Sequence, residues 1–114
     1  MLPGKFRLLG EKNFKRVYQK GHTWQGRFLR IAFLRKLSLP PRFGFVISAK
    51  ALSAASARNL LKRKLRHRVG DYLKKNSPLP PFDVVVGVRR GIKKEHFGQA
   101  VEELEQWLKK FFWV

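Results

Sequence analysis

The sequence predicts an α/β (α+β) two-layer sandwich, in which helices cover a small mixed sheet in a single domain over residues 1–114. Three observations favour this class. The segments predicted along the chain mix helices with short strands. One apolar run has the length and composition of a strand buried on both faces. Hydrophobic residues make up 44% of the 114 residues, which is enough for a packed core.

The N-terminal segment predicts an arm followed by one helix. Residues 1–9 are expected to form an irregular basic arm. Residues 11–20 are expected to be helical, because Phe14, Val17 and Tyr18 recur at spacings of three and four.

Two strands and a long helix are predicted next. Residues 27–34 and 42–48 are rich in aromatic and branched side chains, which favours strands. After a loop of small residues, residues 57–75 are expected to form a helix with Ser56 as its N-cap.

The last third of the chain predicts a buried strand and a final helix. Residues 82–88 form a continuous apolar run, which is typical of a strand covered on both faces. Residues 96–112 predict an amphipathic helix. Its apolar stripe consists of Phe97, Val101, Leu104, Leu108 and Phe111.

The charge of the chain is unevenly distributed. Lys and Arg outnumber Asp and Glu by 26 to 7, which gives a formal net charge of +19. No acid occurs in residues 12–70, although this stretch holds 16 of the 26 basic residues. A surface of one sign over half the chain indicates a polyanionic partner, with nucleic acid as the first candidate and an anionic membrane surface as the second.

The sequence shows no catalytic constellation of its own. It has no cysteine, its acids are dispersed, and its three histidines have no carboxylate partner at ligand or triad spacing. No apolar stretch approaches the ~20 residues that span a bilayer. Residues 1–5 lack the apolar core of a signal peptide. We therefore expect a cytoplasmic binding protein without catalytic residues, and we assign no metal ligands.

The helix predicted over residues 57–75 carries the most informative pattern. Leu61, Leu65, Val69 and Tyr72 share one arc, which is expected to face the sheet. Five donor-bearing side chains share the face beside it: Arg58, Asn59, Lys62, Arg63 and Arg66. Like charges one turn apart repel by about 0.2–0.5 kcal/mol, so contact with nucleic acid explains this face better than solvation.

Phe14 and Tyr18 lie one turn apart and admit two interpretations. Such a pair on a short amphipathic helix usually packs in the core, and the residues alone favour this. The alternative is that the two rings stack bases of a single strand beside a basic groove. Four side chains are expected to line that groove: Lys12, Lys15, Arg16 and Arg30.

Taken in order over nearly the whole chain, these segments resemble the protein subunit of bacterial ribonuclease P. The resemblance is carried by Arg58-Asn59-x-x-Lys62-Arg63-x-x-Arg66 after Ile47-Ser48-Ala49-Lys50, by Phe14-x-x-x-Tyr18-x-x-Gly21, and by Phe82-Asp83-Val84-Val85-Val86 before Arg89. It implies a ribosomal-protein-like fold with a left-handed βαβ crossover. It also implies an endoribonuclease in which the RNA subunit, with Mg²⁺ bound mainly to RNA, removes the 5′ leader from precursor tRNA.

The resemblance assigns the binding residues to two partners, the RNA subunit and the 5′ leader of precursor tRNA. It implies no binding to a membrane and no required protein partner. Contacts to the RNA subunit are expected from Arg58, Asn59, Lys62, Arg63, Arg66 and Lys50. Contacts to the precursor leader are expected from Phe14, Tyr18, Phe33, Lys15 and Arg30. The RNA that Arg27, Arg89 and Arg90 contact is left open.

Two positions put parts of this assignment in question. Leu60 stands where the family has an arginine, which removes one RNA contact or adds a hydrophobic neighbour. On the first predicted strand, Ala32 and Phe33 point to opposite faces, so only one of them can face the leader; we prefer Phe33 for its ring. The alternative function is a ribosomal or ribosome-assembly protein of related fold with no catalytic role.

Overall fold

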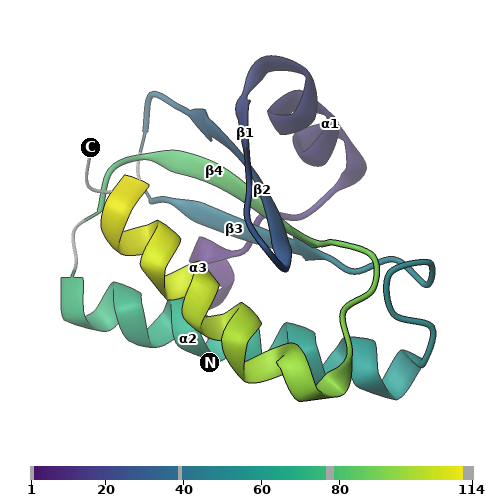
Figure 1. Ribbon diagram of the computed structural model, residues 1–114. Helices are drawn as coiled ribbons and strands as arrows, with labels where there is room; N and C mark the ends of the chain where they lie inside the picture. Colours follow the sequence, from purple (N-terminus) through teal and green to yellow (C-terminus); the bar gives the residue numbers. More distant parts are fainter. Residues whose placement is uncertain (1, 39, 77–78, 112–114) are drawn as a thin grey trace.

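The computed structural model describes residues 2–38, 40–76 and 79–111, and it contains a four-stranded mixed sheet in the order β1-β2-β4-β3 (Figure 1). The strands are β1 (His22–Gln25), β2 (Leu29–Arg35), β3 (Arg42–Val46) and β4 (Phe82–Val88). β1 pairs antiparallel with β2, and β2 with β4, whereas β3 and β4 are parallel. The small mixed sheet that the sequence predicts is confirmed.

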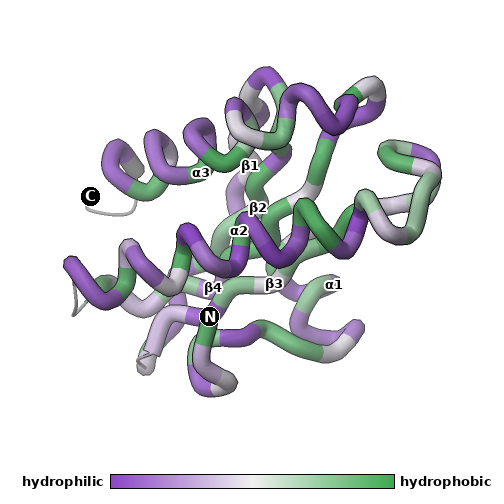
Figure 2. Tube along the Cα trace, turned by 90° about the horizontal axis from the view of Figure 1, so that it is seen from below, coloured by the Kyte–Doolittle hydropathy of each residue, from purple (hydrophilic) through white to green (hydrophobic). Residues whose placement is uncertain are grey.

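In the described part of the chain, three α-helices cover the sheet. They are α1 (Glu11–Lys20), α2 (Ala55–Asn76) and α3 (Phe97–Phe111). α2 and α3 lie side by side on one face, while α1 lies on the other (Figures 1 and 2). The sheet and the α2/α3 pair form the predicted sandwich, and α1 adds cover on the second face.

The alternation of β4 divides its side chains between two cores. Val84 and Val86 point toward α2 and α3, and they pack in the larger core with Leu65 and Leu104. Val85, between them, points toward α1 and packs in a smaller core. The strand is therefore buried on both faces, which is why it reads as an unbroken apolar run.

The connection from β3 through α2 to β4 joins two adjacent parallel strands. Seen from the helix side with both strands pointing up, β4 lies to the left of β3 (Figures 1 and 2). The crossover is left-handed, as the resemblance implies and against the usual preference for right-handed connections.

Three details of the fold differ from the sequence predictions. β1, which begins at His22, is an additional edge strand that the sequence predictions do not include. α2 begins at Ala55, so Ser56 lies inside the helix and is not its N-cap. The final helix starts at Phe97, after a 3-10 turn, and not at His96. Phe112, where the helix is predicted to end, lies outside the described residues.

The N-terminal arm is packed against the sheet. Leu2 and Leu8 are each only 1% exposed. The amide of Leu8 donates to the carbonyl of Phe43 at 2.9 Å, and Arg7 forms a parallel bridge with the same residue. The arm therefore extends the sheet beside β3 and fixes the position of Arg7.

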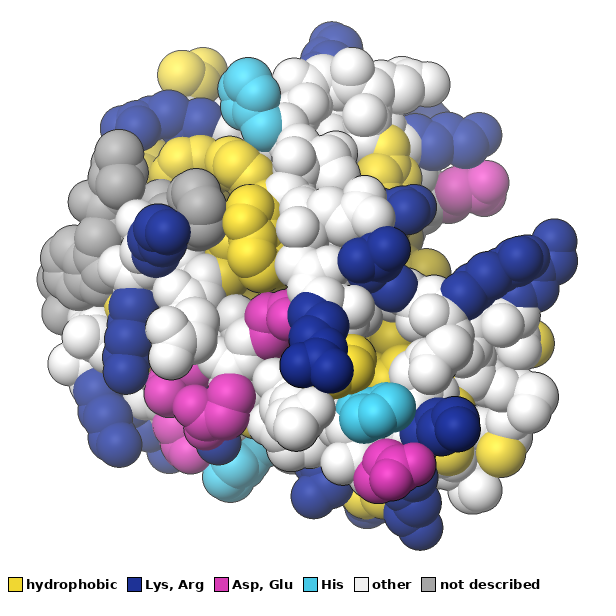
Figure 3. All heavy atoms as spheres, in the orientation of Figure 1, with side chains coloured by type: hydrophobic (Ala, Val, Ile, Leu, Met, Phe, Trp, Pro, Cys, Tyr) yellow, Lys and Arg dark blue, Asp and Glu magenta, His cyan; other side chains and the backbone are white. Residues whose placement is uncertain are grey.

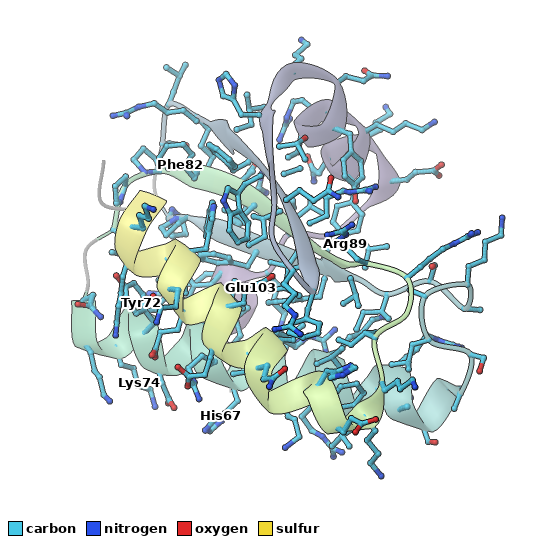
Figure 4. All side chains as sticks on the ribbon, viewed as in Figure 1. His67, Tyr72, Lys74, Phe82, Arg89 and Glu103 are labelled. Carbon is cyan, nitrogen blue, oxygen red and sulfur yellow. The ribbon has the colours of Figure 1, made fainter. Side chains whose placement is uncertain are left out.

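Acids of α3 hold the helix layer in place. Both carboxylate oxygens of Glu103 accept hydrogen bonds from backbone amides at the entry to β2, the shortest from Leu29, the first residue of the strand, at 2.8 Å (Figure 4). The guanidinium of Arg68 on α2 pairs with Glu102 at 2.8 Å and with Glu105 at 3.5 Å. Glu102, Glu103 and Glu105 of α3 thus serve contacts within the fold.

Candidate nucleic-acid interface

The inner face of α2 packs as the sequence predicts. Leu61, Leu65 and Val69 are fully buried, and Tyr72 is 5% exposed. Burial of each aliphatic side chain contributes about 1.5–3 kcal/mol, so this stripe fixes the rotation of the helix. The basic side chains beside the stripe are consequently held at the surface.

Those side chains surround a hollow of about 540 Å³, which we call the α2 hollow. It is lined by Arg7, Asn59, Lys62, Arg63, Arg66 and His67. Four of the six are residues predicted to contact the RNA subunit. Arg7 joins them from the N-terminal arm, a neighbour that helix periodicity alone cannot reveal.

Arg58 belongs to the same predicted set but is directed elsewhere. Its Nη1 donates to the carbonyl oxygens of Leu52 and Ser53 at 2.9 and 2.7 Å. The guanidinium therefore fastens the loop before α2, and it does not line the hollow.

Leu60, which stands where the resemblance implies an arginine, is half-buried and packs against the edge of the larger core. It lines a separate shallow hollow between α2 and α3, together with Lys64 and Gly98. The substitution thus supplies a hydrophobic neighbour beside the α2 hollow.

A second hollow of about 510 Å³ lies on the face of the sheet that carries α1, and we call it the α1 cleft. Basic and aromatic side chains on its walls are Tyr18, Arg30, Lys50, Arg89 and Arg90. Gly87 and Val46 contribute to its floor from β4 and β3. Because Gly87 lacks a side chain, the backbone of β4 is open to a ligand at this point.

Tyr18 presents its ring to this cleft. The side chain is 50% exposed, although it is a large aromatic group. Partial burial raises the pKa of the Tyr18 hydroxyl, and the nearby charge of Arg30 offsets part of that shift. The phenol therefore stays neutral at physiological pH beside a cation, an arrangement suited to stacking a base whose phosphate contacts Arg30.

Phe14 is mainly a packing residue. Its ring lies over Gly44, where an added Cβ would come within 2.6 Å of Phe14 Cε1. It is half-buried against the smaller core formed by Leu8, Val17, Ala32 and Val85. Of the two interpretations of the aromatic pair, packing describes Phe14, whereas Tyr18 remains open to the cleft.

The preference for Phe33 over Ala32 on this face is wrong. The ring of Phe33 lies 5.5 Å from that of Trp107 and 6.2 Å from that of Phe82, between the sheet and α3. Ala32 is the residue that points toward α1, and it is buried in the smaller core. Phe33 is therefore separated from Tyr18 by the sheet, because strand alternation gives the two faces to successive residues.

Several cations lie apart from their predicted sets. Lys12 and Arg16, both predicted to line the groove beside Tyr18, are not among the residues lining the cleft. Lys15 is on the exposed side of α1, where its Nζ lies 3.7 Å from Glu11, and it is not among the residues lining the cleft. Lys50, predicted to join the helix set, lines the α1 cleft instead. Arg89 and Arg90, which the sequence leaves unassigned, also lie there.

Neither hollow has a carboxylate among its lining residues. On the face drawn in Figure 3, acidic side chains lie mainly over the helix layer, and Lys and Arg side chains lie both beside them and around the margin. Within residues 2–38, 40–76 and 79–111, no group of three or more His, Cys, Asp or Glu could hold a metal ion. No helix in that part of the chain is long and apolar enough to cross a membrane.

Comparison with known proteins finds one family throughout. The family model described as Ribonuclease P matches residues 2–111. The ribonuclease P protein component of a Picosynechococcus species is 34% identical over 106 residues, covering 90% of each chain. That of Streptomyces bikiniensis is 41% identical over 96 residues, covering 75% of this chain and 74% of the relative.

Solved structures agree with these sequence matches. The ribonuclease P protein from Thermotoga maritima superposes with a TM-score of 0.73 at 26% identity, covering 92% of this chain and 96% of that one. A Staphylococcus aureus ribonuclease P protein, at 23% identity, gives a TM-score of 0.73 over 94% and 97% of the two chains and shares the fold. These matches give no support to the ribosomal alternative.

Proposed function

The chain belongs to the ribonuclease P family, and we propose that its two basic hollows divide the binding of RNA within that enzyme. As a ribonuclease P protein component, it acts in tRNA processing as the RNA-binding protein of a ribonucleoprotein endonuclease. In our proposal the α2 hollow binds the RNA subunit, and the α1 cleft binds the single-stranded 5′ leader of precursor tRNA.

The observation that carries this division is the different chemistry of the two hollows. The α2 hollow offers guanidinium, ammonium and amide donors on a rigid helix. Such donors suit the phosphates and base edges of a folded RNA. The α1 cleft adds the half-exposed ring of Tyr18 to its cations. A stacking ring beside cations suits an unpaired strand.

We further propose that hydrolysis belongs to the RNA subunit and its Mg²⁺ ions. Mg²⁺ prefers oxygen ligands, above all carboxylates and phosphates. The residues lining the two hollows include no carboxylate, so they do not fit a magnesium site, and we derive no metal-dependent step on the protein. The contribution of these residues is to screen RNA phosphates and to hold the leader, which lowers the Mg²⁺ concentration that the enzyme requires.

Reconstitution tests the proposal. The full chain is mixed with a bacterial ribonuclease P RNA at low Mg²⁺, and cleavage of precursor tRNA is followed. We expect stimulation of cleavage, and tighter binding of a precursor with a leader than of mature tRNA. Absence of stimulation would exclude the role in ribonuclease P; stimulation without leader preference would exclude leader binding in the cleft.

A further inference from the structure

A third basic cluster, which belongs to neither hollow, surrounds the buried carboxylate of Asp83. Asp83 is 1% exposed and lies near the start of β4. Arg16 comes to it from α1, Lys36 from the segment after β2, and Arg42 from the start of β3. We call these three cations and the carboxylate the Asp83 cluster.

All the acceptor positions of the carboxylate are occupied. Oδ1 lies 3.0 Å from Arg42 Nε and 3.1 Å from Lys36 Nζ. Oδ2 lies 2.9 Å from Arg42 Nη2 and 3.0 Å from Arg16 Nη2. With about four lone-pair positions on a carboxylate, Asp83 is saturated and holds the three cations in fixed places.

The cluster carries more positive charge than the carboxylate needs. One cation neutralises Asp83, and the other two leave a net charge of +2 at a partly buried place. The side chains of Arg16, Lys36 and Arg42 are 43%, 18% and 30% exposed. Their contacts with Asp83 use two of the five N–H groups of Arg42 and one of the five of Arg16. Donors therefore remain for an anion at the surface.

The cluster is distant from the α1 cleft. β4 begins at Phe82 and ends just before Arg89, and these two residues mark its opposite ends in Figure 4. Asp83 lies at the first end, whereas Gly87 and Arg89 line the cleft at the second. Four residues of strand span about 13 Å, and the smaller core beneath α1 lies between the two places.

We propose that Arg16, Lys36 and Arg42 form a binding site for one phosphate group of RNA, with Asp83 as the residue that positions them. A phosphate presents several acceptor oxygens to the unused donors, and Arg forks match it well. Its negative charge balances the excess that Asp83 leaves. The identification of the anion as an RNA phosphate rests on the proposed function, because the enzyme's partners are RNA.

The site itself is tested without RNA. Inorganic phosphate is titrated into the full chain at constant ionic strength, and the ¹⁵N side-chain resonances of the arginines are followed. We expect the resonances of Arg16 and Arg42 to shift saturably. In Arg16→Gln the apparent affinity read from Arg42 should fall about tenfold, because a charged donor is lost. Arg16→Lys, which keeps the charge, should recover part of the affinity.

Lys74→Gln is the matched control for charge, because it removes one exposed cation at the end of α2, away from β4 (Figure 4). It should leave the titration unchanged. Arg16→Gln is expected to fold, since Asp83 keeps the two-pronged contact with Arg42 and the contact with Lys36. The proposed site would be overturned if Arg16→Gln and Lys74→Gln changed the phosphate affinity equally. It would also be overturned if phosphate did not shift the resonances of Arg16 and Arg42 in the parent chain.

Two further measurements, each with a different RNA, identify which RNA supplies the phosphate. The dependence of affinity on salt is measured for the RNA subunit alone, and for precursor binding by the assembled enzyme. Arg16→Gln should reduce the magnitude of the slope by ~1 for the RNA that supplies the phosphate. Unchanged slopes with both RNAs would refute the RNA contact, even if reconstitution succeeds. A phosphate titration that succeeds where reconstitution fails would refute the proposed function and leave the site standing.

Discussion

Replacement of Tyr18 gives the sharpest test of the α1 cleft. Tyr18→Ala removes a ring that is 50% exposed, so little packing is lost and the fold should be retained. Stacking of one base on an aromatic ring contributes about 1–3 kcal/mol, which corresponds to roughly a 5- to 150-fold loss of affinity for a ligand that uses it. Because half of the ring is covered in the free protein, we expect a loss in the lower part of this range, about tenfold.

The assay compares two tRNAs that differ only in the leader. Affinities of the reconstituted enzyme are measured by fluorescence anisotropy for a precursor with a leader and for mature tRNA. Tyr18→Ala should weaken precursor binding about tenfold and leave mature tRNA binding unchanged. Tyr18→Phe is the matched control: it keeps the ring, and the pKa of Tyr18 is already raised, so a neutral ring is present in both proteins at pH 7.

Three results would refute this reasoning. Equal losses for the two tRNAs would mean that Tyr18 acts on something other than the leader. A loss as large in Tyr18→Phe as in Tyr18→Ala would assign the effect to the hydroxyl and not to stacking. A melting temperature several degrees lower in Tyr18→Ala would show that the ring stabilises the fold.

Other predictions test the cleft floor, the two roles on α2 and the buried carboxylate. Gly87→Leu should fill the α1 cleft without disturbing the fold, since a Cβ at this position meets only ordinary contacts, the nearest at 3.4 Å. It should weaken precursor binding more than RNA-subunit binding. Equal weakening of both would contradict the proposed division of RNA binding between the two hollows. Arg63→Ala should lower by ~1 the magnitude of the slope with which RNA-subunit affinity depends on salt. Arg58→Ala should instead destabilise the loop before α2 that Arg58 fastens, and amide hydrogen exchange in that loop should increase. The reverse pattern would exchange the roles assigned to the two arginines. Burial would raise the pKa of Asp83, but hydrogen bonds and charges from Arg42 and Lys36 outweigh burial and hold the pKa below its ordinary value. Its stabilisation is therefore complete above the unfolded pKa of about 3.9 and is lost as the pH falls through the lower folded pKa. Asp83→Asn should lower the free energy of unfolding, measured in urea at pH 7, by about 3–5 kcal/mol, and the loss of stability in acid that Asp83 causes should disappear. A decrease under about 1 kcal/mol would show that the positions of the cations do not depend on the carboxylate.

The periodicity of apolar residues predicts those parts of the fold in which the sequence pattern alone determines which side of a helix or strand is buried. The stripe of Leu61, Leu65 and Val69 fixes which side of α2 is buried, and with it the exposed face of Lys62 and Arg66. β4 is equally clear, because only a strand covered on both faces is apolar throughout. β1 was missed because it is an edge strand whose burial is limited to one half-buried tryptophan.

The site is less predictable, because its residues meet through the fold and not through spacing. Alternation shows that Ala32 and Phe33 face opposite ways but not which face carries α1; the contact of Phe33 with Trp107 decides it. Lys50 lies in the cleft because of the path of a loop. The partners of Asp83 come from three segments far apart in the sequence, and no local pattern links them to it.

The placement of the acids has a kinetic consequence. Asp83 and Glu103 are directed to groups within the fold, and Glu102 pairs with Arg68 across two helices. No carboxylate is therefore among the residues that line either hollow, although Asp71 contacts His67 at the edge of the α2 hollow at 3.3 Å, and the field over both hollows is dominated by cations. Such a field attracts a polyanion from a distance of about a Debye length, ~8 Å at physiological salt, and accelerates its diffusional encounter. The placement of the few acids of the chain thus helps to set how fast RNA arrives.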